Sequence, residues 1–418
     1  MEIPKGYKQS EVGVIPQDWD VMPLGDILEF KNGLNKGKEY FGYGDPIINY
    51  IDVYHNNGIK FSDVKGKVFL STDEIRRFQV RAGDVFFTRT SETPEEVGFA
   101  AVLLEDIPNC SFSGFVLRGR PKCDFLSKEY CVYCFQTKHF RNEVINSCTY
   151  TTRALTNGRV LSKIYIPVPP VNEQKAIAMA LSNIDELIAG LGEQIEKKRQ
   201  IKDGAMQQLL TGKTRLPGFN GDWMKVSLGE IGTFVSGGGF PLQYQGNLDE
   251  ELPFYKVSDF NNSGNEKYMI VANNYVSRQT AKFLGCKIIP AKSIVFAKIG
   301  AALMLERKRI TSTDCCIDNN MMSFQPNDNL DVEFLHGILL RLSLSDFAEV
   351  TALPSLKQSS LQKIVIHIPQ TKEEQSAIAQ ILSDMDDEIR QLEAERDKYA
   401  FIKQGMMQEL LTGKTRLV

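Results

Sequence analysis

Two groups of polar, loop-borne residues carry side-chain types that bind nucleic acid. Lysine, arginine, asparagine and serine form hydrogen bonds with base edges and phosphates, and glycine loops let a backbone approach a ligand closely. Any one of these residues alone is typical of an ordinary surface turn. As two groups, they are predicted to contact DNA: Lys31, Asn32, Lys36, Thr88, Arg89, Thr90 and Ser91 in the first, and Ser236, Gly237, Gly238, Lys256, Ser258, Lys298, Asn319 and Asn320 in the second.

A second candidate motif is the Gly-Lys-Thr sequence at 212–214 and 413–415, which looks like the end of a phosphate-binding loop. That loop needs a glycine five residues before its second glycine, where this chain has Gln207 and Gln408. The segments also close helices, whereas a phosphate-binding loop opens one. A helix end with basic residues is one alternative, and a contact surface for another protein is the one we favour. The predicted subunit-binding residues are Leu210, Thr211, Gly212, Lys213, Leu411, Thr412, Gly413 and Lys414.

No set of residues predicts catalysis or metal binding. Cys131 and Cys134 form a Cys-x-x-Cys pair, but the second pair that a zinc site needs is missing at clean spacing. Apolar and aromatic neighbours instead favour a buried helix with core thiols. The four histidines have neither metal-helix spacing nor the context of a catalytic triad. We therefore expect a protein without enzymatic activity or a cofactor of its own.

The bulk properties exclude several classes of protein. The chain has 418 residues, a net charge of −3 and a pI near 6.0, so it does not grip nucleic acid by net charge alone. The N-terminus does not read as a signal peptide, and no apolar run approaches the length of a membrane span. The scattered cysteines fit reduced thiols, which favours the cytoplasm and no membrane contact.

An internal repeat sets the architecture. Residues 173–216 recur without a gap at 374–417, with 24 of the 44 aligned positions identical. In the first copy, apolar residues from Ile177 to Ile195 follow steps of four and three, which is a heptad seam. The second copy keeps this register from Ile378 to Leu392. Because each seam is narrow, we predict that the two helices pair with each other; two independent surface helices are the alternative.

The helix ends carry their own signals. Thr371 and Glu374 predict a capping box at the second helix start, and Asn172 is a candidate cap after Pro169-Pro170 at the first. Gly212 and Gly413 suit the left-handed residue that ends a helix. Each helix is thus about 40 residues and about 60 Å long.

The rest of the chain is predicted to be rich in β-strands. Runs such as 84–87 and 293–296 alternate with turn signals, and a helical stretch follows in each part, near 126–147 and 331–349. Trp19 with 24–27 echoes Trp223 with 228–231, so the two parts are distantly alike. The predicted fold is α+β, a pseudo-two-fold repeat of two β-rich domains at 1–170 and 214–370. Two long helices at 171–213 and 371–418 separate them and pair as an antiparallel coiled coil.

These motifs resemble the specificity subunits of type I restriction-modification enzymes. The resemblance is carried by Pro-Pro-Val-Asn-Glu-Gln at 169–174, Asp185 and the closing Leu-Leu-Thr-Gly-Lys, and by their second copy. Gly83-Asp84 before the strand and the glycine loop at 236–241 are similar to family features. Phe240 replaces the usual threonine, and Ala291-Lys292-Ser293 departs from the glycine-aspartate form.

The resemblance implies two target-recognition domains, each reading one half of a split double-stranded DNA target, with the helices as a spacer. It also implies two docked methyltransferase subunits and restriction subunits, to which S-adenosylmethionine, ATP and Mg²⁺ belong. A coiled-coil scaffold that binds only proteins is the alternative, and DNA binding by the chain with its methyltransferase partner distinguishes the two.

Overall fold

The computed structural model describes residues 3–349 and 353–417. The chain forms two compact units. Unit 1 contains Met1–Gly192 and Ala394–Val418, and unit 2 contains Glu193–Glu393. Each unit therefore holds one β-rich part and a portion of both long helices.

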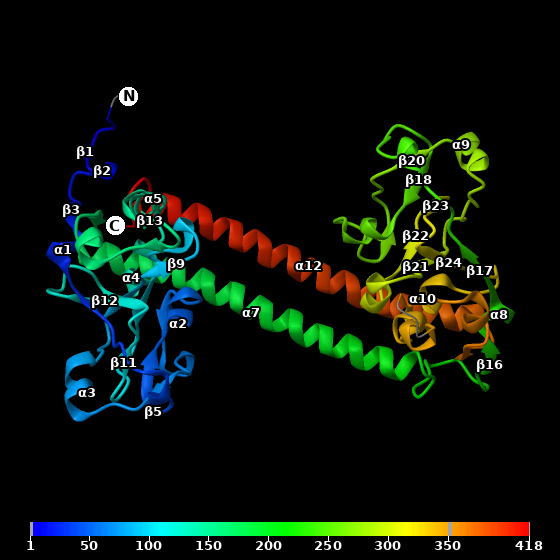
Figure 1. The fold of residues 1–418 in the computed structure, drawn as a ribbon, viewed down its shortest axis with the longest axis horizontal. Coiled ribbons are helices and arrows are strands. Elements are labelled where there is room, and N and C mark those ends of the chain that lie inside the picture. The colour runs from blue at the N-terminus through cyan, green and yellow to red at the C-terminus, as the bar shows by residue number, and fades with distance from the viewer. Residues whose placement is uncertain (1–2, 350–352, 418) are drawn as a thin grey trace. The chain divides into compact units, whose positions relative to one another are not determined.

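Unit 1 is built around a five-stranded sheet with the order β4-β12-β8-β10-β6. All neighbours in it are antiparallel except β10 and β6. A three-stranded sheet, β11-β5-β7, packs near it, and smaller pairings are β1-β2, β3-β15 and β13-β14-β9 (Figure 1). The strands are β1 (Tyr7–Ser10), β2 (Gly13–Pro16), β3 (Asp20–Pro23), β4 (Leu28–Asn32), β5 (Phe41–Ile48), β6 (Gly58–Ile59), β7 (Lys67–Val68), β8 (Val85–Thr88), β9 (Thr90–Ser91), β10 (Ala100–Leu103), β11 (Ser111–Phe112), β12 (Val116–Pro121), β13 (Thr149–Tyr150), β14 (Ala154–Leu155) and β15 (Tyr165–Val168). The shorter helices are α1 (Leu24–Ile27), α2 (Tyr50–Tyr54), α3 (Thr72–Phe78), α4 (Lys128–Cys134), α5 (Lys138–Ser147) and α6 (Gly158–Leu161).

Unit 2 repeats this plan. Its five-stranded sheet has the order β17-β24-β21-β22-β19, again with one parallel pair at the β22-β19 edge, beside the sheet β20-β18-β23. The strands are β16 (Met224–Ser227), β17 (Gly232–Ser236), β18 (Leu252–Tyr255), β19 (Tyr268–Met269), β20 (Tyr275–Val276), β21 (Ile294–Ala297), β22 (Lys308–Thr311), β23 (Cys316–Ile317), β24 (Met321–Pro326) and β25 (Val365–Ile368), which pairs with β16. The shorter helices are α8 (Leu228–Ile231), α9 (Arg278–Phe283), α10 (Val332–Leu340) and α11 (Gln358–Leu361). The predicted likeness of the two parts is confirmed by this shared topology.

The central strand of each large sheet is buried on both faces. In β8, Val85 and Phe87 face the core beneath the helices, while Phe86 faces the core shared with the smaller sheet. In β21, Ile294 likewise faces the core beneath the helices, and Val295 faces the core shared with the smaller sheet. Side chains alternate between the faces of a strand, so a run of consecutive apolar residues holds two cores together.

The two long helices are α7 (Val171–Leu209) and α12 (Lys372–Leu410). Asn172 lies inside the first turn of α7 and not at its cap, because the helix already begins at Val171. At α12, the Thr371 hydroxyl accepts the Glu374 amide at 3.4 Å, but the Glu374 carboxylate bonds elsewhere, so the predicted capping box is only half formed. Gly212 and Gly413 take the predicted left-handed conformation, with φ of 68° and 71°.

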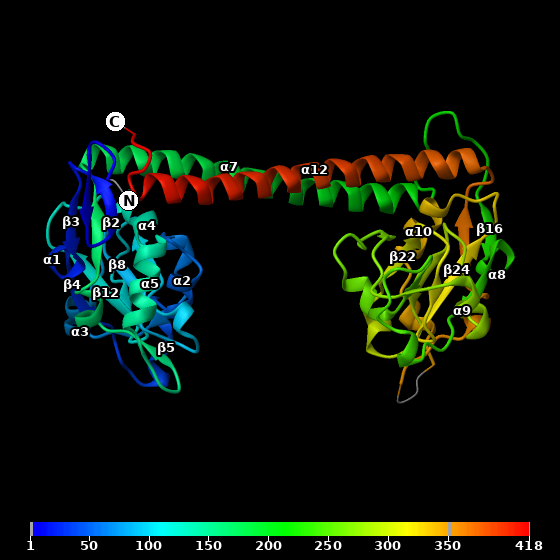
Figure 2. The same cartoon turned by 90° about the horizontal axis from the view of Figure 1, so that it is seen from above.

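The helices pair along their seams within each unit, in antiparallel directions (Figures 1 and 2). In unit 1, Ile177 and Leu181 share a core with Leu410, and Lys403 bonds Asp185 at 2.6 Å. In unit 2, Leu209 shares a core with Ile378 and Leu382. Ion pairs flank the second seam: Lys198 with Glu388, Arg199 with Glu393, and Lys202 with Asp386. The antiparallel coiled coil predicted from the heptads is thus confirmed.

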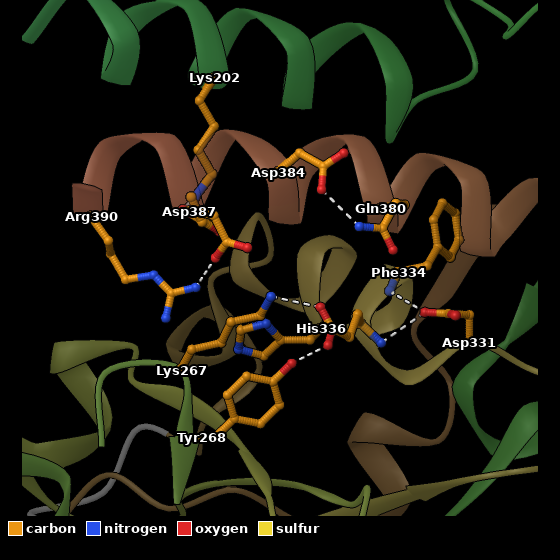
Figure 3. A network of polar contacts seen from close by, with 12 residues as sticks. Lys202, Lys267, Tyr268, Asp331, Phe334, His336, Gln380, Asp384, Asp387 and Arg390 are labelled. Carbon is orange, nitrogen blue, oxygen red and sulfur yellow. Dashed lines mark hydrogen bonds and ion pairs between the residues drawn. The ribbon is translucent and has the colours of Figure 1, made fainter. Parts of the chain in front are cut away.

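In unit 2, α10 lies against α12 around a cluster of polar side chains (Figure 3). Glu333 takes hydrogen bonds from Lys267, at 2.6 Å, and from Tyr268. Beside it, the buried His336 has Nε2 3.0 Å from the Lys308 carbonyl oxygen. Burial, followed by the nearby charges of Lys267 and Arg309, lowers the pKa of His336 to about 4.

This histidine predicts a pH dependence of stability. Its folded pKa lies below the unfolded value of about 6.5, so its contribution is complete above pH 6.5 and is lost as the pH falls toward 4. We expect urea unfolding to report about 2–3 kcal/mol less stability at pH 4.5 than at pH 7 from this residue. His336→Gln should flatten that part of the slope, whereas the exposed His367→Gln should not. Equal slopes in the wild type and both variants would contradict the prediction.

Candidate functional sites

The ends of two strands bring the predicted DNA-binding residues of unit 1 together. β4 and β8 both pair antiparallel with β12, so they run in the same direction and end at the same edge of the sheet. Asn32 ends β4, and Arg89 directly follows β8. In unit 2, β17 and β21 flank β24 identically, which places Ser236 and Lys298 at the corresponding edge. We call these two edges the polar edges of units 1 and 2.

Arg89 and Lys298 occupy equivalent places. The Arg89 amide donates to the Phe115 carbonyl at 3.0 Å, and the Arg89 carbonyl accepts the Thr156 amide at 3.0 Å. Lys298 makes the same two bonds, with the Asn320 carbonyl at 2.7 Å and the Leu356 amide at 3.0 Å. Both backbones are therefore fixed on two sides. Each side chain is partly exposed, as a residue that contacts a ligand must be.

The glycines of these loops serve packing inside the chain. A Cβ on Gly33 would lie 2.1 Å from the Ser113 carbonyl oxygen, and one on Gly237 would lie 1.9 Å from that of Asp318. A Cβ on Gly238 would lie 2.6 Å from the Cys286 sulfur. The structure gives both glycines a packing role, Gly237 against the Asp318 backbone and Gly238 against the Cys286 side chain. Their contact with DNA stays a prediction.

Several other predicted DNA-binding residues are engaged within their domains. Thr88 is fully buried, and its hydroxyl accepts the Phe99 amide at 2.9 Å. Ser91 is buried and donates to Glu96 at 2.8 Å. Thr88 and Ser91 thus support the local backbone and a neighbouring carboxylate, and their contact with DNA stays a prediction. Lys36 pairs with Glu74 at 2.6 Å, and Lys256 donates to Gln245 at 2.9 Å, so both ammonium groups already have partners.

The remaining predicted residues stay partly or fully exposed. In unit 1 they are Lys31, Asn32, Arg89 and Thr90, and in unit 2 they are Ser236, Ser258, Lys298, Asn319 and Asn320. Ser258 lies in a different segment, at 257–261, from the strand ends that carry Ser236 and Lys298. Without Ser258, each polar edge thus retains four predicted side chains.

A cavity of about 430 Å³ lies at the polar edge of unit 1. Its lining includes three cationic side chains, Lys31, Arg89 and Arg159, together with Asn32 and Asn157. Burial lowers the pKa of Lys31, and the positive charges of Arg118, Arg77 and Arg120 lower it further. Such a positive field attracts phosphate groups.

Asn157 and Arg159 were missed by the sequence reasoning. They lie more than 65 residues from Arg89 along the chain, and the loop reaches it because Thr156 bonds the Arg89 backbone. The available signal was the turn-like Asn157-Gly158 dipeptide, and Asn157 does cap α6 by accepting the Val160 amide at 3.1 Å.

The Leu-Leu-Thr-Gly-Lys segments are used mainly within the chain. Leu210 and Leu411 are buried in the cores of units 2 and 1. Their side chains therefore pack inside the chain, and their contact with a partner subunit stays a prediction. A Cβ on Gly413 would lie 2.4 Å from the Pro16 ring. Thr211 and Thr412 each donate to a carbonyl of their own helix at 2.6 Å. Of the eight predicted subunit-binding residues, the exposed side chains are those of Thr211, Lys213 and Lys414.

The arginine that follows each segment ties two helix ends together. In unit 1, Arg416 binds Glu173 at 2.7 Å and Asp18 at 2.8 Å, and the Trp19 indole donates to Glu173 at 2.8 Å. Arg416 lowers the pKa of Asp18 by hydrogen bonding. In unit 2, Arg215 binds Glu374 at 2.6 Å. Removing either arginine would leave a buried glutamate without its charged partner, which is destabilising.

The glutamine after each of these glutamates anchors a β-rich part to its helix. The buried Gln174 side chain accepts the Ser127 amide at 2.8 Å, at the start of α4. Gln375 accepts the Asp331 amide at 2.9 Å, at the start of α10. The Glu-Gln pair of the repeat therefore fixes each domain on its own helix start, which explains why both copies contain it.

The described residues show no group of three or more histidine, cysteine, aspartate or glutamate side chains placed to hold a metal ion. Cys131 and Cys134 are buried in the core of unit 1, as predicted. None of the helices in residues 3–349 and 353–417 combines the length and apolar character needed to cross a bilayer.

Comparison with known proteins decides the family. The model of the type I restriction-modification DNA specificity domain matches the chain twice, at residues 16–197 and 220–398. The chain belongs to this family. Two specificity-subunit relatives come from Methanocaldococcus jannaschii. The putative type I restriction enzyme MjaX specificity subunit is 27% identical, covering 99% of this chain and 97% of the relative. The type I restriction enzyme MjaIX specificity subunit is 25% identical, covering 87% and 86%.

Solved structures of specificity subunits share the fold. An S subunit from M. genitalium matches with a TM-score of 0.55 at 16% identity, covering 98% of both chains. A structure described as showing complex assembly and conformational transition of the type I system matches with a TM-score of 0.61 at 16% identity, covering 96% of this chain and 99% of that one. This chain therefore has two specificity domains and a fold shared with these solved structures.

Proposed function

We propose that this chain is the DNA-specificity subunit of a type I restriction-modification complex. Each domain reads one half of a bipartite double-stranded DNA target, through the polar edge of its own sheet. The observation that carries this proposal is the equivalence of Arg89 and Lys298, which two unlike sequences hold with the same backbone bonds. Around them, the side chains differ between the domains, as two different half-sites require.

The paired helices act as the spacer between the half-sites. Each has 39 residues and is about 58 Å long. A continuous helix with a matched seam transmits length and rotation better than a flexible linker, so the gap in the target is set by the helices. Two methyltransferase subunits dock on the repeated features, where Lys213 and Lys414 remain exposed, and restriction subunits join them. The complex works in the cytoplasm.

The chemistry belongs to the partner subunits. S-adenosylmethionine, ATP and Mg²⁺ are theirs, and this chain supplies recognition. We expect the purified chain, free of partners, to show no methyl transfer, DNA cleavage or ATP hydrolysis above a buffer control, and the reconstituted complex to show methyl transfer. Turnover by the chain alone would overturn this assignment. A coiled-coil scaffold that binds only proteins is not favoured, because the chain belongs to a DNA specificity family.

Substitution of the two equivalent cations tests the polar edges. Arg89→Ala and Lys298→Ala should each weaken DNA binding by the complex with methyltransferase subunits. If the side chain reads a base, the loss is about 1–3 kcal/mol and relaxes specificity at one position; if it holds a phosphate, all sequences weaken alike and the salt slope falls by about one. Lys225→Ala, an exposed cation on β16, is the control. Unchanged binding at several salt concentrations would exclude both roles.

A further inference from the structure

An exposed aromatic side chain stands at the polar edge of unit 1. Phe115 is 63% exposed, although phenylalanine is normally buried. It lies between β11 and β12, in a tight turn closed by the Val116 amide on the Ser113 carbonyl at 3.1 Å. The apolar ring therefore faces solvent beside the cations of this edge.

The backbone around Phe115 is fixed on both sides. Its carbonyl accepts the Arg89 amide at 3.0 Å, and the Gly114 amide donates to the Leu34 carbonyl at 2.7 Å. The Arg89 guanidinium also reaches the Gly114 carbonyl at 3.5 Å. A side chain presented from a rigid turn loses little conformational entropy when it meets a ligand.

Unit 2 holds a different chemistry at the same place. Its corresponding turn is closed by the Met321 amide on the Asp318 carbonyl at 3.0 Å, and Asn320 there accepts the Lys298 amide. Asn320 therefore occupies the position of Phe115. The two turns are closed by equivalent backbone bonds. At the matching position, the first domain has the apolar side chain of Phe115 and the second has the amide side chain of Asn320.

The surroundings of Phe115 are suited to a DNA duplex. It lines a cavity of about 380 Å³ with Ile51, which is exposed, and with Thr90, Glu92 and Arg153. The other carboxylate of this cavity, Glu96, is already bonded by Tyr54 and Ser91. Positive charge lies near the ring, because the Arg89 guanidinium reaches the neighbouring Gly114 carbonyl and the exposed Arg153 lines the same cavity. Such charge attracts the phosphate groups of DNA.

We propose that Phe115 contacts the C5-methyl group of a thymine in the half-site read by the first domain. The inference rests on the proposed function. In the major groove, this methyl group is the apolar feature that distinguishes one base from the others, and an exposed ring cannot form the hydrogen bonds that read the remaining edges. Phe115 thereby requires an A·T pair at one position of that half-site, a requirement that Asn320 does not impose in the second.

The test removes the methyl group and the ring separately. Thymines of the first half-site are replaced one at a time by deoxyuridine, which lacks only the methyl group, and binding by the complex with methyltransferase subunits is measured. Burial of one methyl group predicts about fourfold weaker binding at one position. Phe115→Ala should abolish that effect, while Asn320→Ala should retain it. Because Phe115 carries no charge, Phe115→Ala should also leave the salt slope unchanged.

Two results would overturn the contact. One is the absence of any deoxyuridine effect in the wild type, and the other is an effect that persists in Phe115→Ala. In an alternative role, the ring would insert as a wedge between base steps. Phe115→Ala would then bind DNA more weakly, but deoxyuridine would have no effect in the wild type. That result would count against the proposal. Arg89→Ala separates this failure from failure of the proposed function, since it weakens binding if the polar edge meets DNA at all.

Discussion

Replacing residues 217–370 with the same region of a relative should change one half of the DNA target and leave the other half intact. The expected effect is large, because a specific site is typically bound 10³–10⁷ times more tightly than other DNA. The structure supports independence, since each β-rich part has cores of its own and is anchored on its helix by the buried Gln174 or Gln375. Mapping of methylated bases in cells that carry the chimaera measures the outcome.

The chimaera must keep the contacts that seat the domain. Gln375 accepts the backbone amide of Asp331, and Ser376 donates to the Asp331 carboxylate at 2.8 Å. A donor with an aspartate at the start of the α10 equivalent is therefore the matched choice. The reciprocal exchange of residues 1–170 is the control and should alter the other half-site. Changes in both halves after a single exchange would contradict independent reading.

Insertion of four residues after Gln194 should lengthen the gap in the target or prevent assembly. It adds about 6 Å of helix and rotates the remainder of α7 by about 40° beyond one full turn. The seam beyond Ile195 and the ion pairs of Lys198 and Lys202 would then leave their register with α12. The first pair is exposed and the second is partly exposed. Such pairs contribute about 0–1 kcal/mol each, so the apolar seam decides whether the slip is tolerated. A surviving complex should show a gap longer by one or two base pairs at about 3.4 Å each.

A paired insertion provides the matched control. Seven residues after Gln194 and seven after Glu393 restore the heptad phase in both helices and add about 10.5 Å. This variant should fold, and its gap should grow by about three base pairs. A stable, active complex with the original gap, in either variant, would show that the helices do not measure DNA.

The long helices and the central strands could be predicted because each signal lies within one short segment of the sequence. A heptad seam such as Ile177 to Ile195 is a property of one segment, and its partner had the same register. Val85 to Thr88 is likewise recognisable as a strand because every side chain is apolar or β-branched. The repeat of residues 173–216 at 374–417 then indicated two similar units.

The polar edges were only partly predictable, because strand pairing joins residues far apart in sequence. Nothing local places Thr156 against Arg89, so Arg159 was missed. Phe115 was missed because its residue type predicts burial. The bond from the Phe99 amide to the Thr88 hydroxyl was not foreseen, since a hydroxyl in a polar motif serves its own backbone as readily as a ligand. The burial of Leu411 was not foreseen, because its core includes Trp19, almost 400 residues away.

Bipartite recognition by this chain can be tested in its host. Methylated bases are mapped across the host DNA, with the gene for this chain present and deleted, and with all partner genes intact. We expect a bipartite sequence with two specific parts and a constant gap, which disappears on deletion and returns on complementation. Methylation that is unchanged by the deletion, or a target that forms one uninterrupted sequence, would contradict recognition of two half-sites by the two domains.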